Sequence, residues 1–212
     1  EEETAKADIE KQKAQEIEED VTQRQGAAEA VMAEAQPAVD AAMAALDTLN
    51  KKDLGEAKTM SKAPEGVDDI FAAVAQLLAG ITHSTNAAIA ELAENIICKK
   101  NGAVKDTSWG ASKKSLLTNI SVFLTALLGY KQCIETNEPP EANFKHIRHY
   151  LKLEHFDADI IRGKNSAAAG LCAWVQNIVI YRDIHVKVEP LRIELEECNE
   201  RLAGARASLA KA

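Results

Sequence analysis

Apolar residues recur every seven positions through the first fifty residues of the chain. One column lies at Val21, Ala28, Ala35, Ala42 and Leu49, and a second, four residues after members of the first, lies at Met32, Val39 and Leu46. Two such columns form the apolar seam of a coiled-coil helix. A competing column at Ile17, Arg24 and Val31 leaves the register of this Ala-rich seam open. Pro37 removes a backbone donor, so we expect a kink or a local break there.

A second heptad pattern occupies residues 187–212. Its apolar positions step by three and four residues and lie at Val188, Leu191, Leu195, Cys198, Leu202, Ala205, Leu209 and Ala212. Neither helix can bury its seam alone, so the sequence predicts that the two ends pair antiparallel within one chain. We expect the second helix to cover the stretch from Ala28 to Asn50 and to leave the N-terminal turns of the first unpaired. Because both patterns reach the ends of the sequence, we expect a segment of a longer protein.

Residues 64–186 carry the spacing of several shorter helices. Apolar positions predict helices that begin near residues 64, 87, 109, 140 and 167. No stretch alternates as a strand does, and the Asn101-Gly102 step lacks flanking strands, so no hairpin is expected there. The sequence therefore predicts an all-α fold.

The expected architecture is a small helical bundle at the tip of an intramolecular antiparallel two-stranded coiled coil. Residues 1–63 would form the outgoing strand, residues 64–186 the bundle and residues 187–212 the returning strand. Pro64 and Pro190 would mark the two boundaries, because each stands where a coiled-coil pattern meets the bundle.

Charge is distributed unevenly along the chain. The 212 residues carry 25 Lys+Arg and 33 Asp+Glu, a net charge of −8, and residues 1–63 alone hold 8 basic and 15 acidic residues. Residues 99–164 hold 11 basic and 7 acidic residues, which indicates either a localised acidic partner or an ordinary solvated surface. The acidic balance argues against nucleic-acid binding. No signal peptide is visible, and no apolar run reaches the roughly 18–20 residues of a membrane span, so no membrane contact is expected.

The sequence lacks the residue patterns of catalytic and metal sites. Four widely spaced cysteines, with no C-x-x-C pair, are typical of reduced thiols in a cytosolic compartment. His146 and His149 share a helical face, but no Cys or carboxylate completes a ligand set. Gly163-Lys164-Asn165-Ser166 lacks the leading glycine of a phosphate-binding loop. We therefore expect no enzyme activity, no cofactor and no metal.

Several runs resemble one protein family. Ala35-Gln36-Pro37-Ala38-Val39, Ala44-Ala45-Leu46-Asp47-Thr48-Leu49 and Ala63-Pro64-Glu65-Gly66-Val67 are similar to the outgoing stalk strand of dynein heavy chains. Asn165 to Val175 resembles the last helix of the dynein microtubule-binding domain, and Val188-Glu189-Pro190-Leu191-Arg192 the start of the returning strand. The likeness covers the whole chain in order. The Ala169-Gly170-Leu171-Cys172-Ala173-Trp174 run looks more like axonemal than cytoplasmic heavy chains.

The resemblance implies a function. In this family the stalk carries a tubulin-binding tip far from an ATP-hydrolysing ring, and sliding between coiled-coil registers sets the affinity of the tip. The Ala-rich seam with two possible columns agrees with such sliding, although it also fits a merely weak coiled coil. The implied partners are tubulin and the rest of the dynein motor. The implied location is the cytoplasm and cytoskeleton, in the axoneme of a cilium or flagellum.

The resemblance also implies which basic residues face the acidic track. By position, Arg162 and Lys164 come first, followed by Lys113 and Lys114, and the remaining candidates are Arg148, Lys152, Lys99, Lys100 and Lys105. Relatives carry a basic residue where this chain has Asp68, beside Asp69, and another where it has Thr118. Acidic groups facing an acidic track cost affinity, so we expect weak, salt-sensitive binding or shifted contacts.

An alternative is a helical hairpin that acts as an adaptor for a protein partner. The stretch from Ile89 to Trp109 is longer than in the cytoplasmic chain, and outer-arm dyneins can carry a leucine-rich-repeat light chain on such a tip. Salt-dependent binding to polymerised tubulin, lost when Arg162 and Lys164 are reversed in charge, distinguishes the two functions.

Overall fold

The structure, a computed structural model, describes residues 2–211. Within that range the chain forms nine α-helices and no strand, which confirms the all-α prediction. The helices are α1 (Glu2–Asp47), α2 (Lys51–Thr59), α3 (Val67–Leu78), α4 (Ala87–Glu94), α5 (Trp109–Leu116), α6 (Ile120–Glu135), α7 (Glu141–Leu151), α8 (Ala158–Arg162) and α9 (Ser166–Lys211). None of these helices is both long and apolar enough to cross a membrane.

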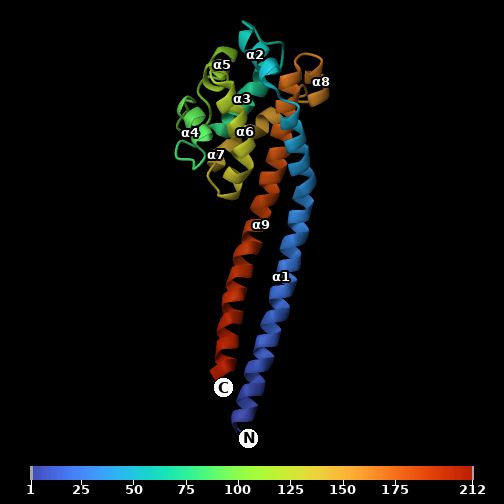
Figure 1. Cartoon of the computed structure of the whole chain (residues 1–212), viewed down its shortest axis with the longest axis vertical. Coiled ribbons are helices and arrows are strands. Elements are labelled where there is room, and N and C mark those ends of the chain that lie inside the picture. Colours follow the sequence, from blue (N-terminus) through green and yellow to red (C-terminus); the bar gives the residue numbers. More distant parts are fainter. Residues whose placement is uncertain (1, 212) are drawn as a thin grey trace. The chain divides into compact units, whose positions relative to one another are not determined.

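The chain divides into two compact units. The first unit holds the residues up to 36 together with those from 183 onward, and the second unit holds residues 37–182. The long helices α1 and α9 each contribute to both units (Figure 1). The division into 1–63, 64–186 and 187–212 stays a prediction.

In the first unit α1 and α9 run antiparallel, side by side (Figure 1). The heptad predicted for α9 lines the pairing face: Val188, Cys198 and Leu202 are buried, and Leu191, Leu195, Ala205 and Leu209 are half-buried. Most of the residues between them are exposed. These apolar positions therefore form the seam that the sequence predicted.

In the first unit the structure decides between the two columns that the sequence left open on α1. Ile17, Arg24 and Val31 are half-buried in the first unit, whereas Met32 is 36% exposed. Toward the N-terminus the column of Met32 continues as Gln25 and Glu18, which are polar. Because α9 pairs with this part of α1, the column with the greater apolar content faces the seam.

Ion pairs place residues 194–206 of α9 opposite residues 18–24 of α1. Glu194 contacts Arg24 at 2.5 Å, Arg201 contacts Asp20 at 3.4 Å, and Arg206 contacts Glu18 at 3.1 Å. The expectation that the returning segment covers 28–50 is therefore wrong, whereas residues 2–6 at the start of α1 stay exposed. The reason is that α9 begins at Ser166, so an earlier part of the same helix reaches residues 45–49.

Two prolines lie inside the long helices. α1 continues through Pro37 and α9 continues through Pro190, so the local break considered at Pro37 does not occur. Each proline removes one backbone donor, and the long helices on either side hold the helical path.

α3 forms the centre of the second unit. Ten of its 12 residues are buried, because its sequence is apolar on nearly every side. α5 and α7 both pack against α3, and α4 packs mainly against α6. Tyr130 of α6 donates its hydroxyl to the carbonyl of Leu77 at 2.6 Å and meets the Trp174 ring edge-on, with 5.5 Å between ring centroids.

A short hairpin follows α4 and turns at Asn101-Gly102, so the expectation that no hairpin forms there is wrong. Lys105 N–H donates to Ile97 O at 2.9 Å, Lys99 N–H donates to Ala103 O at 2.7 Å, and Gly102 takes a φ of +84° in the turn. The paired segment is too short for strand alternation to show. A side chain from α3 holds it: Gln76 Oε1 accepts from Val104 N–H at 3.0 Å, and Gln76 Nε2 donates to Gly102 O at 3.1 Å.

Gly170 allows α9 to approach the end of α1 closely. A Cβ at this position would lie 2.7 Å from Thr48 Oγ1 and 3.0 Å from Leu49 Cδ2. Thr48 is itself fixed, because its hydroxyl donates to Ala45 O at 2.6 Å.

We predict that Gly170→Ala lowers the free energy of unfolding by about 1–3 kcal/mol, because the added methyl group has no space. Gly204→Ala is the matched control on the same helix, since a Cβ there meets nothing within 4 Å. The control should gain about 0.5–1 kcal/mol from helix propensity. Urea unfolding followed by circular dichroism measures both, and equal responses of the two variants would contradict the close approach.

Candidate functional site

The connection between α2 and α3, residues 60–65, is where several candidate side chains meet. Lys113 Nζ donates to Met60 O at 2.7 Å, and Trp109 Nε1 donates to the same carbonyl at 2.9 Å. Lys164 Nζ donates to Glu65 O at 2.7 Å. Two of the predicted basic residues, from α5 and from the α8–α9 connection, therefore contact one short segment, which we call the junction.

Local sequence explains the path of the junction. α2 ends at Thr59, and Met60 is extended, which leaves its carbonyl free to accept from α5. Gly66 takes a φ of +87° and starts α3; a Cβ there would lie 2.8 Å from His155 Cδ2. His155 also contacts Asp69 of α3, with 2.7 Å between Nε2 and Oδ2.

Arg162 and Lys164 lie on either side of Gly163, directly before α9. Arg162 is the last residue of α8 and contacts Asp159 at 2.7 Å, with most of both side chains exposed. Exposed pairs of this kind contribute little and are easily exchanged for another partner. Arg162 and Lys164 are both exposed, so their charges face solvent close to the junction.

Lys113 and Lys114 are neighbours in sequence with different surroundings. Lys113 is half-buried and lies over the Trp109 ring, 5.6 Å from its centroid. Lys114 is exposed and lines a cavity beside α5. The charge of Lys113 is therefore used within the fold, and that of Lys114 faces solvent.

The remaining candidates lie on two other elements. Lys99, Lys100 and Lys105 are exposed on the hairpin of residues 97–105. Arg148 of α7 is half-buried and has an interaction partner, whereas Lys152 at the end of α7 is exposed.

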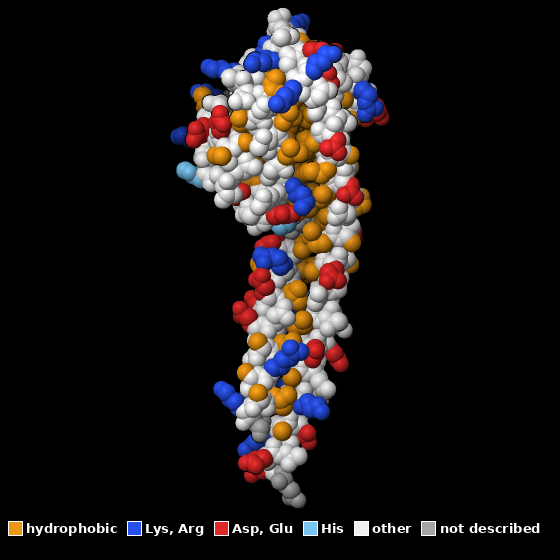
Figure 2. Space-filling view, in the orientation of Figure 1, with side chains coloured by type: hydrophobic (Ala, Val, Ile, Leu, Met, Phe, Trp, Pro, Cys, Tyr) orange, Lys and Arg blue, Asp and Glu red, His pale blue; other side chains and the backbone are white. Residues whose placement is uncertain are grey.

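Two further lysines belong to the same region but were not among the predicted contacts. Lys58 Nζ donates to Thr118 O at 3.3 Å, and Lys62 is exposed in the junction. Both fell in the predicted outgoing strand, 1–63, although they belong to the second unit. Figure 2 shows Lys and Arg side chains gathered over the end of this unit that holds α2, α5 and α8.

The acidic residues that depart from the family pattern are partly compensated. Asp68 and Asp69 are half-buried in the first turn of α3, where the helix dipole favours negative charge. Asp69 is also in contact with His155. Burial, with smaller contributions from Asp69 and Asp68, raises the pKa of Tyr150 to about 12, so this phenol stays neutral beside them.

The histidines are engaged with backbone oxygens. His146 Nε2 lies 2.9 Å from Asn101 O, and His149 Nδ1 lies 2.6 Å from His146 O. Among residues 2–211, no group of three or more His, Cys, Asp or Glu side chains is placed to hold a metal ion.

Comparison with known proteins identifies the family. The sequence profile described as "Microtubule-binding stalk of dynein motor" matches residues 1–212. The chain belongs to this dynein stalk family.

Individual dyneins agree with this assignment. "Dynein heavy chain-like protein 2" of Plasmodium falciparum is 39% identical over 203 residues, covering 92% of this chain. "Dynein alpha chain, flagellar outer arm" of Chlamydomonas reinhardtii is 39% identical over 180 residues, covering 85% of this chain. "Dynein axonemal heavy chain 17" of Homo sapiens is 36% identical over 205 residues, covering 96%. The chain spans only about 4% of the length of these relatives, and the predicted likeness to axonemal heavy chains is confirmed.

For this dynein stalk we predict that Lys113→Met lowers the free energy of unfolding by about 0.5–1.5 kcal/mol, because a half-buried hydrogen bond to Met60 O is lost. Lys114→Met, one residue along the same helix, should change it by less than about 0.5 kcal/mol. Urea unfolding followed by tryptophan fluorescence measures both. If Lys114→Met is the more destabilising change, the contact of Lys113 with the junction does not stabilise the fold.

Proposed function

We propose that this dynein stalk binds tubulin through the lysine and arginine side chains around the junction, with Arg162 and Lys164 at the centre of the contact. The observation that supports this most strongly is the meeting of Lys113 and Lys164 at residues 60–65, with exposed Lys62 and Arg162 beside them. Tubulin presents an acidic surface, and opposite charges steer association and fix orientation.

The hydrogen bond of Lys164 to the Glu65 carbonyl competes with the proposed contact of Lys164 with tubulin. Its ammonium donates to Glu65 O, so binding to an acidic track exchanges one acceptor for another. Asp68 and Asp69 lie in the first turn of α3, and their negative charges oppose the binding of an acidic partner. We therefore propose a weak contact that depends steeply on salt, since exposed charges are screened over about 10 Å at 0.1 M salt.

In sequence, the proposed contact lies after the C-terminal end of α1 and before the N-terminal end of α9. α1 leads through α2 to the junction, and Lys164 precedes the first residue of α9 by two positions. A shift of α1 along α9 would therefore change how the junction and Lys164 meet. On this basis we propose that the register of α1 and α9 sets the affinity for the microtubule.

The wider role follows from the relatives. The ATP-hydrolysing ring of the family would lie outside this segment, and the segment itself would be non-catalytic. The relatives named for flagellar and axonemal dyneins favour a location in the axoneme of a cilium or flagellum. The rest of the dynein motor would be the second partner of the stalk.

Co-sedimentation with taxol-stabilised microtubules across a salt series tests the proposed contact. We expect saturable binding that weakens with salt and that falls at least tenfold in Arg162→Glu/Lys164→Glu, because both substitutions place acidic groups against an acidic surface. The matched control is Lys11→Glu/Lys187→Glu, which changes the net charge equally on exposed positions of the first unit.

The control should bind within twofold of the parent chain. Equal weakening of both double variants would show that only net charge matters and would contradict the proposed contact. Failure of a folded, helical parent chain to bind at low salt would also contradict it. It would favour the alternative, an adaptor for a partner such as a leucine-rich-repeat light chain.

A further inference from the structure

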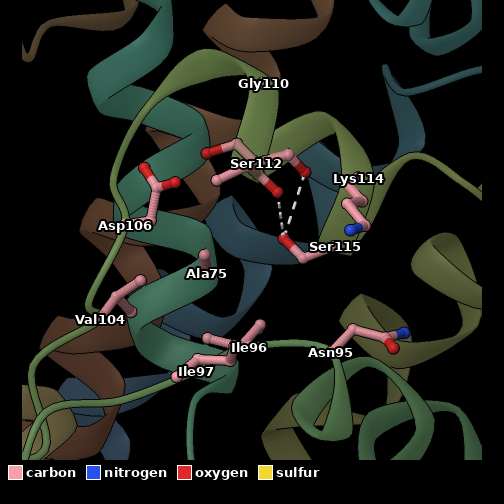
Figure 3. Close-up of a pocket in the computed structure, with 11 residues that line it drawn as sticks. Ala75, Asn95, Ile96, Ile97, Val104, Asp106, Gly110, Ser112, Lys114 and Ser115 are labelled. Atoms are coloured by element: carbon pink, nitrogen blue, oxygen red, sulfur yellow. Dashed lines mark hydrogen bonds between the residues drawn. The ribbon is translucent and has the colours of Figure 1, made fainter.

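A cavity of about 310 Å³ opens in the second unit between α3, α5 and the hairpin of residues 97–105 (Figure 3). Ala75, Ile96 and Val104 contribute apolar side chains to its walls. Ile97, also a lining residue, is 70% exposed. The volume lies at the lower end of the range for binding pockets and fits one large side chain better than a whole cofactor.

Two serine residues of α5 line the cavity. Ser112 is only 3% exposed and is one of the lining residues. Ser115, on the same helix, donates to the Ala111 and Ser112 carbonyls at 3.0 and 3.3 Å. A few polar groups in a mostly apolar pocket fix the orientation of an occupant, and the Ser112 hydroxyl can serve as one of them.

The charges around the opening favour an acidic occupant. In Figure 3, Lys114 lies on the α5 side of the cavity and Asp106 on the hairpin side. Asp106 accepts from Ser108 N–H at 3.0 Å, and this hydrogen bond holds the pKa of its carboxyl below the usual value, so Asp106 is a negative charge that the surrounding lysines must outweigh. Lys99, Lys100 and Lys105 add three exposed cations on the hairpin.

The exposed Ile97 favours a peptide over a small molecule. A large apolar side chain left in water beside an apolar cavity is typical of a protein contact, in which one anchor side chain enters a pocket and its neighbours cover the rim. The hairpin is also held in place before binding: Gln76 bonds its backbone, and a Cβ at Gly102 would lie 2.7 Å from Ala142 Cβ. A preformed site loses less entropy when it binds.

We propose that this cavity, with the hairpin, binds an acidic peptide segment that carries one large apolar side chain. The apolar side chain enters between Ile96 and Val104 and packs under Ile97. Acidic residues on either side of it face Lys114 and the hairpin lysines, and a backbone polar group of the peptide bonds the Ser112 hydroxyl. The proposal does not depend on tubulin binding, because a free peptide tests it.

The test uses the full chain, labelled with ¹⁵N, and a short synthetic peptide of Glu, Asp and Gly with one central Leu. We expect amide shift changes concentrated at residues 95–97, 104–106 and 110–115. Replacing the Leu by Ala should weaken binding about tenfold, because the buried anchor is lost. Replacing the acidic residues by Lys should abolish it.

Variants on the protein place the site. Ile97→Ser and Lys114→Glu should each weaken peptide binding at least fivefold. Leu128→Ser is the matched control, because Leu128 is 61% exposed on α6 and does not line the cavity. The proposal is overturned if the Leu and Ala peptides bind equally, if the shift changes spread over all basic surfaces, or if no shift occurs at millimolar peptide.

Discussion

The fold depends on an antiparallel seam of small and medium-sized side chains between two long helices. In the first unit the seam positions include Ala28 and the polar Arg24 on α1, and Cys198 and Leu202 on α9. Such side chains bury little apolar area, and each Å² of apolar area that is buried stabilises the fold by about 25 cal/mol. The ion pairs across the seam are more than a third exposed and add less than about 1 kcal/mol each. The seam is therefore weak, and few groups determine its register.

The charges on the seam differ in their effect on the two directions in which α1 can slide along α9. Asp20 lies opposite Cys198 and Arg24 opposite Glu194, so each turn along α1 corresponds to one turn back along α9. A slide of one turn in one direction would bring Asp20 opposite Leu202, between Arg201 and Arg206. The same slide in the other direction would bring Asp20 opposite Glu194, where like charges repel. The pattern therefore permits sliding in one direction and opposes it in the other.

Periodicity in the sequence was sufficient to predict most of the helices and the seam of α9, because both follow from local spacing, but it did not separate α2 from α1 or α5 from α6. It left two columns open on α1, since Met32 and Val31 are neighbours and only the partner helix decides between them. The hairpin depends on Gln76, more than twenty residues earlier in sequence, and no local pattern reveals that contact. The engagement of Lys113 and Lys164 with backbone carbonyls was equally invisible, because a carbonyl acceptor has no sequence signature.

Coupling between the register of the two helices and microtubule affinity is tested most directly with disulfide-locked forms. Asp20→Cys pairs with native Cys198 and fixes the observed register, and Asp20→Cys/Cys198→Ser/Leu202→Cys fixes the register one turn away; Cys98→Ser is added to both. We expect microtubule affinities that differ at least tenfold between the oxidised forms and that converge when both are reduced. Affinities of the two oxidised forms within twofold of each other would contradict the coupling.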